Sequence, residues 1–184
     1  MSKVLYDTKF LQLKETVSQS GKPWYYAHRP NAEDVVVILP VTSDEVLFLI
    51  EKRPPLFAEG KGEFSVSLPA GLVGDVRKGE TVEEAIKAEL KEEAGLAADR
   101  IKINVNKVSG SSGCISETCV IATAYIEDKK EISKPIDDGG IIVDRIWVKK
   151  SEVKQWLNDK NKEGFVISAH TLAALLYLYW EDEK

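Results

Sequence analysis

Residues 68–96 read LPAGLVGDVRKGETVEEAIKAELKEEAGL, and this stretch decides the fold. It predicts a loop that leads into a short acidic helix. Thr81 and Glu84 form a T-x-x-E capping box, which places the first turn of the helix there, and acidic residues in that turn offset the helix dipole. Gly95 is the residue expected to end the helix.

Three glutamates gather on one face of this predicted helix. Glu89, Glu92 and Glu93 are spaced i, i+3 and i+4, and a turn of about 100° per residue brings their carboxylates to the same side. Like charges at these spacings destabilise a helix by roughly a few tenths of a kcal/mol per pair. No Lys or Arg lies three or four residues from any of them in the sequence. The pattern therefore predicts that positive charge comes from outside the helix.

A solvated charged helix is the ordinary alternative, and Glu83 with Lys87 fits it as an i,i+4 ion pair. That alternative does not explain the other three glutamates. Carboxylate oxygens are the preferred ligands of hard divalent cations that keep several of their waters. The cluster therefore predicts a site for Mg²⁺, with Mn²⁺ as the other candidate metal.

Length and composition limit the classes of protein. The 184 residues fit one domain with a sizeable core. A net charge of −5 and the lack of a long Lys and Arg run argue against a nucleic-acid-binding surface. Cys114 and Cys119 are too few for a disulfide framework and make no zinc pattern with the two histidines. The first residues lack the apolar segment of a signal peptide, and the longest apolar run, 172–180, is too short to span a membrane. We therefore expect a cytoplasmic protein with no membrane partner.

Apolar periodicity predicts a sheet with helices on its faces. Strands are expected at 35–41, 46–50, 64–68, 101–108, 118–126 and 141–148. The first two form a hairpin in a central sheet. Two further helices are expected, one from residue 151 and one after residue 168. Their apolar positions are Val153, Trp156 and Leu157 in the first helix, and Leu172, Leu175, Leu176 and Tyr179 in the second. This arrangement is typical of an α/β sandwich.

Residues 1–30 predict a small N-terminal hairpin, with a polar turn at 18–22. Trp24, Tyr25 and Tyr26 are adjacent, so they cannot all lie on one face of a strand. One side of that strand is expected to pack on the core. The other side offers an aromatic ring to a partner subunit or to the base of a nucleotide.

Arg53 stands where the strand 46–50 ends, because Pro54 and Pro55 follow it. An arginine at the mouth of a strand can grip a phosphate with two N–H groups. A solvated surface arginine is the alternative interpretation of the same spacing.

The stretch 68–96 also resembles the Nudix box, G-x5-E-x7-R-E-U-x-E-E-x-G-U, in which U is an aliphatic residue. The matching residues are Gly74, Glu80, Glu89, Leu90, Glu92, Glu93, Gly95 and Leu96. The arginine position holds Ala88. In the family that arginine braces the glutamates and does not bind metal. Without this arginine we expect the metal to be weakly held. The alternative is that another cation positions the glutamates, and the candidates are Arg53, Arg77 and Arg100.

Segments outside the box narrow the resemblance to the ADP-ribose pyrophosphatase branch of the family. They are Arg53-Pro-Pro55, Pro69-Ala-Gly71, Ser111-Ser-Gly-Cys-Ile-Ser-Glu117 and Ala169-His-Thr-Leu-Ala-Ala-Leu-Leu176. Two features depart from the branch. First, Ser112 replaces the proline of the S-P-G-x-x-x-E motif of this branch. Second, the family often carries a catalytic glutamate in the loop before the last strand, and here that loop reads Asp137-Asp-Gly-Gly140. Asp138 is the candidate to replace that glutamate.

The resemblance implies a Nudix-type α/β/α sandwich with a mixed central sheet, formed by one domain across residues 1–184. It also implies metal-assisted attack of water on a diphosphate. The implied metal ligands are the Glu89, Glu92 and Glu93 side chains and the carbonyl oxygen of Ala70. Glu92 shares a second metal, and the candidate bases are Glu117 and Asp138. The expected substrate contacts are Arg53, Trp24 and Gly113.

ADP-ribose, cleaved to AMP and ribose 5-phosphate, is the substrate that the resemblance favours. Two alternatives stay open: a UDP or GDP sugar as the substrate, and a sensor that binds a nucleotide sugar without hydrolysing it. The branch also implies a homodimer, in which the N-terminal hairpin contacts the partner subunit.

Overall fold

The computed structural model describes residues 2–74, 78–136 and 141–180, and its strands form two sheets. A small antiparallel sheet precedes the main body and consists of β1 (Lys3–Asp7), β2 (Gln12–Val17) and β3 (Pro23–His28). The main sheet has eight strands: β4 (Asp34–Val41), β5 (Glu45–Glu51), β6 (Ser65–Ser67), β7 (Ala70–Val73), β8 (Arg100–Val108), β9 (Cys119–Tyr125), β10 (Ile142–Lys149) and β11 (Val166–Ile167). The helices are α1 (Pro54–Ala58), α2 (Val82–Ala94), α3 (Val153–Lys162) and α4 (Ala169–Trp180).

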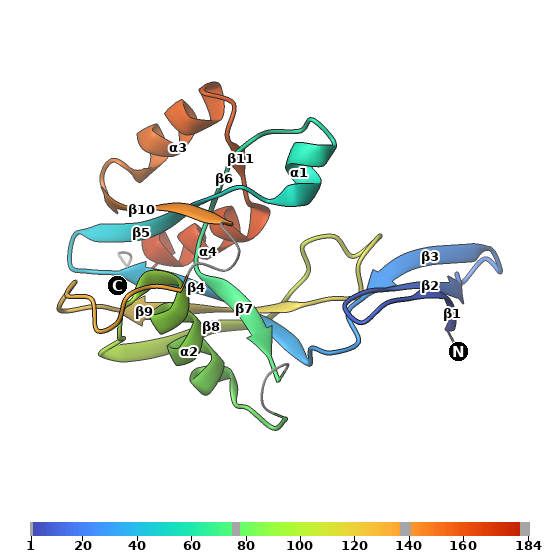
Figure 1. Ribbon diagram of the computed structural model, residues 1–184. Coiled ribbons are helices and arrows are strands. Elements are labelled where there is room, and N and C mark those ends of the chain that lie inside the picture. The colour runs from blue at the N-terminus through green and yellow to red at the C-terminus, as the bar shows by residue number, and fades with distance from the viewer. Residues whose placement is uncertain (1, 75–77, 137–140, 181–184) are drawn as a thin grey trace.

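The β4–β5 hairpin lies at the centre of the main sheet (Figure 1). The two strands pair beside their turn, at Val41 and Val46. Beyond that point, β4 pairs with β7 in antiparallel and with β9 in parallel orientation. β5 pairs with β10 and β6, both antiparallel. The sheet is therefore mixed, as the resemblance implied.

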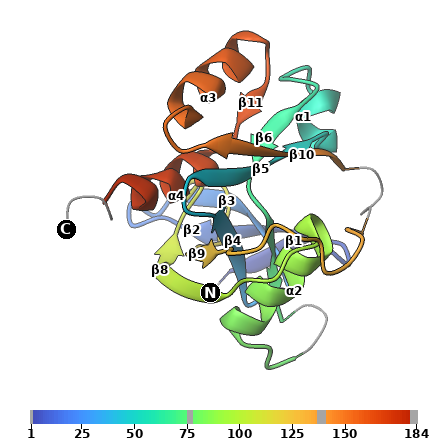
Figure 2. The ribbon, with the colours of Figure 1, turned by 90° about the vertical axis from the view of Figure 1, so that its left-hand side faces the viewer.

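Helices cover both faces of β4, because side chains alternate along a strand. Val36 and Ile38 belong to the buried cluster that includes the apolar side of α2. Val37 and Leu39 belong to the opposite cluster, which includes α4 and α3. Figure 2 shows α2 and α4 on different sides of the strands. The predicted α/β/α sandwich is confirmed.

The acidic helix α2 begins and ends as predicted. The Thr81 hydroxyl accepts a hydrogen bond from the Glu84 N–H at 3.2 Å, and the Glu84 carboxylate accepts one from the Thr81 N–H at 2.9 Å. Gly95 follows the last turn with a φ of 71°, in the left-handed region that favours glycine. The buried face of α2 comprises Ala85, Ile86, Leu90 and Ala94.

The structure adds four elements that the sequence did not predict: β1, α1, β7 and β11. The most consequential is β7, because residues 70–73 were expected to be a loop. Their strand conformation depends on pairing with β4, where Ala70 lies opposite Val37 and Leu72 opposite Val35. Such pairing is a tertiary contact and leaves little local signal.

The orientation of α4 differs from its predicted apolar stripe. Leu172, Leu176 and Tyr179 are 51%, 48% and 47% exposed. The buried positions are Thr171, Ala174, Leu175 and Leu178. Since nearly every residue of α4 is apolar, periodicity could not distinguish the face that packs on β4.

The small N-terminal sheet stands away from the main body (Figure 1). The predicted hairpin corresponds to β2 and β3, which pair from Gln12 with His28 to Val17 with Pro23. Backbone hydrogen bonds join this sheet to the loop before β9, from Ala27 N–H to the Cys114 oxygen at 2.8 Å and from Ser116 N–H to the Ala27 oxygen at 3.1 Å. Within the described residues, no helix has the length and apolar character needed to cross a membrane.

Candidate functional site

The acidic face of α2 meets the main body at β7. The Glu93 Oε2 atom accepts a hydrogen bond from the Ala70 N–H at 2.9 Å. The Glu89 carboxylate lies so close to Gly71 that a Cβ atom at that position would lie 1.8 Å from its Oε1 atom. Glu92 is exposed. The structure therefore brings Glu89 and Glu93 to the strand and leaves Glu92 facing solvent.

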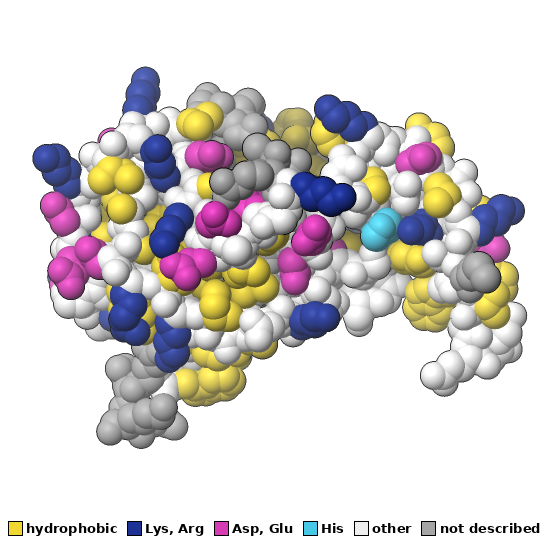
Figure 3. Space-filling view, turned by 90° about the horizontal axis from the view of Figure 1, so that it is seen from below, with side chains coloured by type: hydrophobic (Ala, Val, Ile, Leu, Met, Phe, Trp, Pro, Cys, Tyr) yellow, Lys and Arg dark blue, Asp and Glu magenta, His cyan; other side chains and the backbone are white. Residues whose placement is uncertain are grey.

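Figure 3 views the molecule from the side on which α2 lies. Acidic side chains cross the middle of this face, with lysines and arginines beside them.

Burial raises the pKa of the Glu93 carboxyl group to about 8. The Ala70 N–H opposes this shift by stabilising the carboxylate. The negative charges of Glu89 and Glu51 raise the pKa further, and Arg53 lowers it. A carboxylate in this position is therefore costly to ionise without added positive charge.

Glu51 is a site residue that the sequence interpretation missed. It ends β5 and is 2% exposed. Arg53 donates to it through two atoms, from Nε to Oε2 at 2.9 Å and from Nη2 to Oε1 at 2.5 Å. The signal was present, because Glu51 is a charged residue at the end of an apolar strand, two positions before Arg53.

The donor chemistry around Ala70 fits a hard divalent cation. The groups are carboxylates and a backbone carbonyl, and the charges of Glu89 and Glu51 already disfavour ionisation of Glu93. Across residues 2–74, 78–136 and 141–180, however, no three His, Cys, Asp or Glu side chains converge tightly enough to enclose a metal. The candidate ligands in this region are therefore two carboxylates, Glu89 and Glu93, with the Ala70 carbonyl oxygen.

Of the arginines suggested as substitutes for the missing brace at Ala88, Arg53 acts on the glutamates through its charge. It donates to Glu51, and its positive charge lowers the pKa of Glu93. The Arg100 guanidinium lies over the Tyr125 ring, 3.6 Å from its centroid. Arg77 lies outside the described residues.

Arg145 contacts α2 instead. Its Nε atom donates a hydrogen bond to the carbonyl oxygen of Glu93. That carbonyl is one of the last four of the helix, which have no partner within it. Arg145 therefore fixes the backbone of α2 at Glu93 from β10, a contact that no local pattern predicts.

Glu117, a candidate base, lies in a different hollow. Its Oε2 atom accepts from the Arg29 Nε at 2.7 Å. Both residues line a cavity of about 90 Å³ together with His28 and Ser116. Asp138, the other candidate base, lies outside the described residues.

Trp24 and Gly113, two of the expected substrate contacts, lie together. The indole Nε1 of Trp24 donates to the Gly113 carbonyl oxygen at 2.9 Å. Trp24 is still 49% exposed, so its ring is accessible. Arg53, the third expected contact, belongs to a separate cavity.

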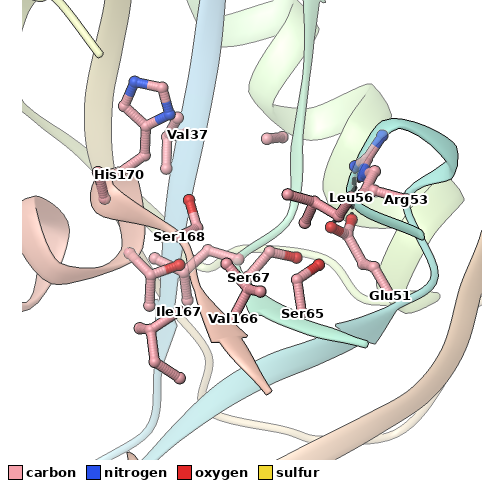
Figure 4. Close-up of a pocket in the computed structure, with 14 residues that line it drawn as sticks. Val37, Glu51, Arg53, Leu56, Ser65, Ser67, Val166, Ile167, Ser168 and His170 are labelled. Atoms are coloured by element: carbon pink, nitrogen blue, oxygen red, sulfur yellow. Dashed lines mark hydrogen bonds and ion pairs between the residues drawn. The ribbon is translucent and has the colours of Figure 1, made fainter. Parts of the chain in front are cut away.

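That cavity, of about 380 Å³, lies between β6, the end of β5 and the first turn of α4. Figure 4 shows Glu51 and Arg53 at one end and His170 at the other. Ala70, the residue that bonds Glu93, also lines it. The cavity therefore adjoins the acidic face of α2 at β7.

A profile of the Nudix domain matches residues 31–168, which span β4 to the residue before α4. No curated protein sequence matches. A solved structure described as an ADP compounds hydrolase has a TM-score of 0.70 and 19% identity, covering 97% of this chain and 90% of that one. At this identity the structural likeness supports the fold alone. The profile match includes α2, the main sheet and the contact between Glu93 and Ala70. Because the match spans most of the chain, the chain belongs to the Nudix hydrolase family.

Proposed function

We propose that this Nudix hydrolase cleaves, with the help of a divalent metal, a nucleoside diphosphate linked to a second moiety. ADP-ribose, giving AMP and ribose 5-phosphate, is the preferred candidate, and a UDP or GDP sugar is the alternative. The observation that carries the proposal is the position of Glu93. It is a half-buried carboxylate whose pKa is raised by desolvation and by the charges of Glu89 and Glu51, and it accepts from Ala70, which lines the cavity that contains Arg53.

Glu89, Glu93 and the Ala70 carbonyl oxygen would hold the main metal, and exposed Glu92 would share a second. Bound Mg²⁺ or Mn²⁺ would polarise the diphosphate oxygens and lower the pKa of the attacking water. Arg53 would donate to the phosphate oxygens and balance their charge. Its pair with Glu51 holds the guanidinium at the cavity.

The reaction breaks one P–O bond of the diphosphate and forms another with water, whose proton passes to a base. Glu117 and Asp138 are the proposed bases. Glu117 would first have to release Arg29 or reach the water while keeping that ion pair. Trp24 on β3 and Gly113 in the loop before β9 would contact the nucleotide.

The proposed assembly is a homodimer formed through the N-terminal sheet. That sheet exposes many apolar side chains, including Val4, Leu5, Tyr6, Phe10, Leu11, Leu13, Val17, Trp24 and Tyr25. Large exposed apolar patches mark association sites, so this sheet is the proposed dimer contact. Light scattering of the chain with and without residues 2–30 tests the proposal, and we expect the shortened chain to be monomeric.

A substrate panel tests the activity. ADP-ribose, ADP-glucose, UDP-glucose and GDP-mannose are incubated with Mg²⁺ and with Mn²⁺, and the monophosphate products are converted to phosphate by a coupled phosphatase. We expect the highest kcat/KM with ADP-ribose and no turnover in EDTA. Preference for a UDP or GDP sugar would support the alternative substrate, and turnover of none would refute the proposal.

Replacement of Gly71 by alanine should reduce turnover about a hundredfold while the chain stays folded. The added Cβ would lie 1.8 Å from the Glu89 Oε1 atom and 2.0 Å from its Cδ atom, so the carboxylate must move. A displacement of this size at a reacting centre costs about two orders of magnitude. Initial rates and the circular dichroism spectrum check both parts. A normal rate for Gly71→Ala would place Glu89 outside the reacting centre.

A further inference from the structure

Three buried hydroxyl groups line the cavity beside Arg53. The Ser65 Oγ, Ser67 Oγ and Thr171 Oγ1 atoms are inaccessible and have no hydrogen-bond partner among the described residues. Ser65 and Thr171 are 4% and 1% exposed. Buried side-chain polar groups in native proteins are normally hydrogen-bonded. Three that are not, in one cavity, point to a ligand with hydroxyl or carbonyl groups of its own.

The backbone explains how these hydroxyls come together. Ser65 and Ser67 are two positions apart on β6, so their side chains project from the same face of the strand. Figure 4 shows them side by side between Glu51 and His170. Thr171 belongs to the first turn of α4, where backbone N–H groups have no partner within the helix.

Beyond Arg53, the walls of the cavity suit a neutral ligand better than a phosphate. Arg53 is the one Lys or Arg among the described lining residues, and Glu51 accepts two of its N–H groups. Leu56, Val166 and Ile167 supply apolar surface. A sugar ring combines hydroxyl groups, which both donate and accept, with C–H faces that pack on such surface.

The far end of the cavity limits the size of that ligand. A Cβ atom at Gly110 would lie 2.7 Å from the His170 Nε2 atom, so the loop before β9 touches this ring. The near end is formed by Arg53 and Ala70. The space between the ends is about 380 Å³, enough for a single sugar ring.

We propose that Ser65, Ser67 and Thr171 bind the sugar attached to the distal phosphate of the nucleoside diphosphate, so that this cavity determines which sugar is accepted. The inference rests on the proposed function, because Arg53 must face the diphosphate for the sugar to enter. In this arrangement the diphosphate lies at Arg53 and Ala70, and the sugar extends over β6 toward His170.

Calorimetric titration of the full chain tests this assignment without turnover. ADP-ribose and ADP are titrated with Ca²⁺ in place of Mg²⁺, and again in EDTA, into the wild type, Ser67→Ala and Thr171→Val. Each variant should weaken ADP-ribose binding about fivefold, the usual worth of one hydrogen bond, and leave ADP binding unchanged. Ser43→Ala, which removes an exposed hydroxyl in the β4–β5 turn, is the control and should change neither.

Thermal unfolding excludes a structural explanation. Because neither hydroxyl has a hydrogen-bond partner in the described part of the chain, both variants should keep or raise the Tm of the wild type. If another nucleotide sugar binds more tightly, the comparison uses that ligand and its nucleoside diphosphate.

The outcomes separate this inference from the proposed function. Equal losses for ADP-ribose and ADP would overturn it, because the cavity would then hold the nucleotide half. If the variants bind ADP-ribose and ADP as the wild type does, the inference is also overturned and the hydroxyls are assigned to ordered water. If no nucleotide sugar binds at all, the inference is overturned as well. If the variants weaken ADP-ribose binding alone but the chain does not hydrolyse it with Mg²⁺, the sugar site is supported and the proposed enzymatic function is refuted. If the chain hydrolyses ADP-ribose but the variants bind it normally, the enzymatic function is supported and the sugar site is refuted.

Discussion

Glu93→Gln should abolish hydrolysis, lowering kcat/KM by about a thousandfold or more. The substitution keeps the shape of the side chain and its contact with the Ala70 N–H, but removes the charge that would hold the metal. Loss of a charge at a metal-assisted centre costs several kcal/mol of transition-state stabilisation, or roughly three orders of magnitude. Steady-state rates across a Mg²⁺ titration measure this loss. Turnover near the wild-type level would exclude Glu93 as a ligand.

The same substitution should stabilise the metal-free protein at alkaline pH. The pKa of Glu93 is raised from 4.5 to about 8 in the folded chain. Between these values the unfolded chain releases the proton and the folded chain retains it, so stability falls as pH rises through this window. Glutamine removes that dependence. In EDTA the Tm of the variant should exceed that of the wild type at pH 8–9 and approach it below about pH 5.

Glu92→Gln is the matched control for this stability effect. It lies one position away on the same helix, but its side chain is exposed. Its Tm in EDTA should follow the wild type across the whole pH range. A Tm for Glu93→Gln that also follows the wild type would show that Glu93 is not desolvated in solution.

Arg53→Ala should lower both stability and substrate affinity. Glu51 is 2% exposed and would lose the guanidinium that donates to both of its oxygens. Removing one partner of a fully buried pair costs about 3–5 kcal/mol, but the Arg53 side chain is 42% exposed, so we expect about 2 kcal/mol. KM for a nucleoside diphosphate sugar should rise about tenfold, because a phosphate contact is lost. Urea denaturation and initial rates measure the two effects.

A second substitution distinguishes the two roles of Arg53. In Glu51→Gln/Arg53→Ala the buried carboxylate is gone, so most of the lost stability should return while KM stays high. Together with Glu51→Gln alone, it completes a double-mutant cycle on one ion pair. If the double variant is as unstable as Arg53→Ala alone, the arginine stabilises the chain through a different contact.

The sequence predicted those parts of the fold whose determinants are local. Both ends of α2 followed from Thr81, Glu84 and Gly95, because a capping box and a left-handed glycine act within one turn. The buried strands followed from their β-branched runs. Residues 70–73 were misjudged as loop because only pairing with β4 makes them a strand. The outward face of α4 was misjudged because the helix is apolar on nearly all sides.

In the candidate site, too, the sequence predicted the features that depend on local spacing and missed those that depend on tertiary contacts. The spacing of the glutamates correctly placed Glu89 and Glu93 on one face of α2, but only the fold distinguishes them from exposed Glu92. Arg145 reaches the Glu93 carbonyl from 52 positions away in the chain, and Arg29 reaches Glu117 from 88. Contacts over such distances depend on how the strands pack, and neither a motif nor an apolar periodicity predicts that packing.

The parallel pairing of β4 with β9 also bears on the order in which the chain folds. Val35 lies opposite Cys119 in this ladder, so a long loop must close before the centre of the main sheet exists. Long-range pairing of this kind slows folding, whereas the capping box of α2 acts locally and can form within microseconds. We therefore expect α2 to form helix early in folding, with its acidic face still in water. The unfavourable burial of Glu93 is then imposed late, when β7 joins β4, and a divalent cation present at that step should accelerate refolding.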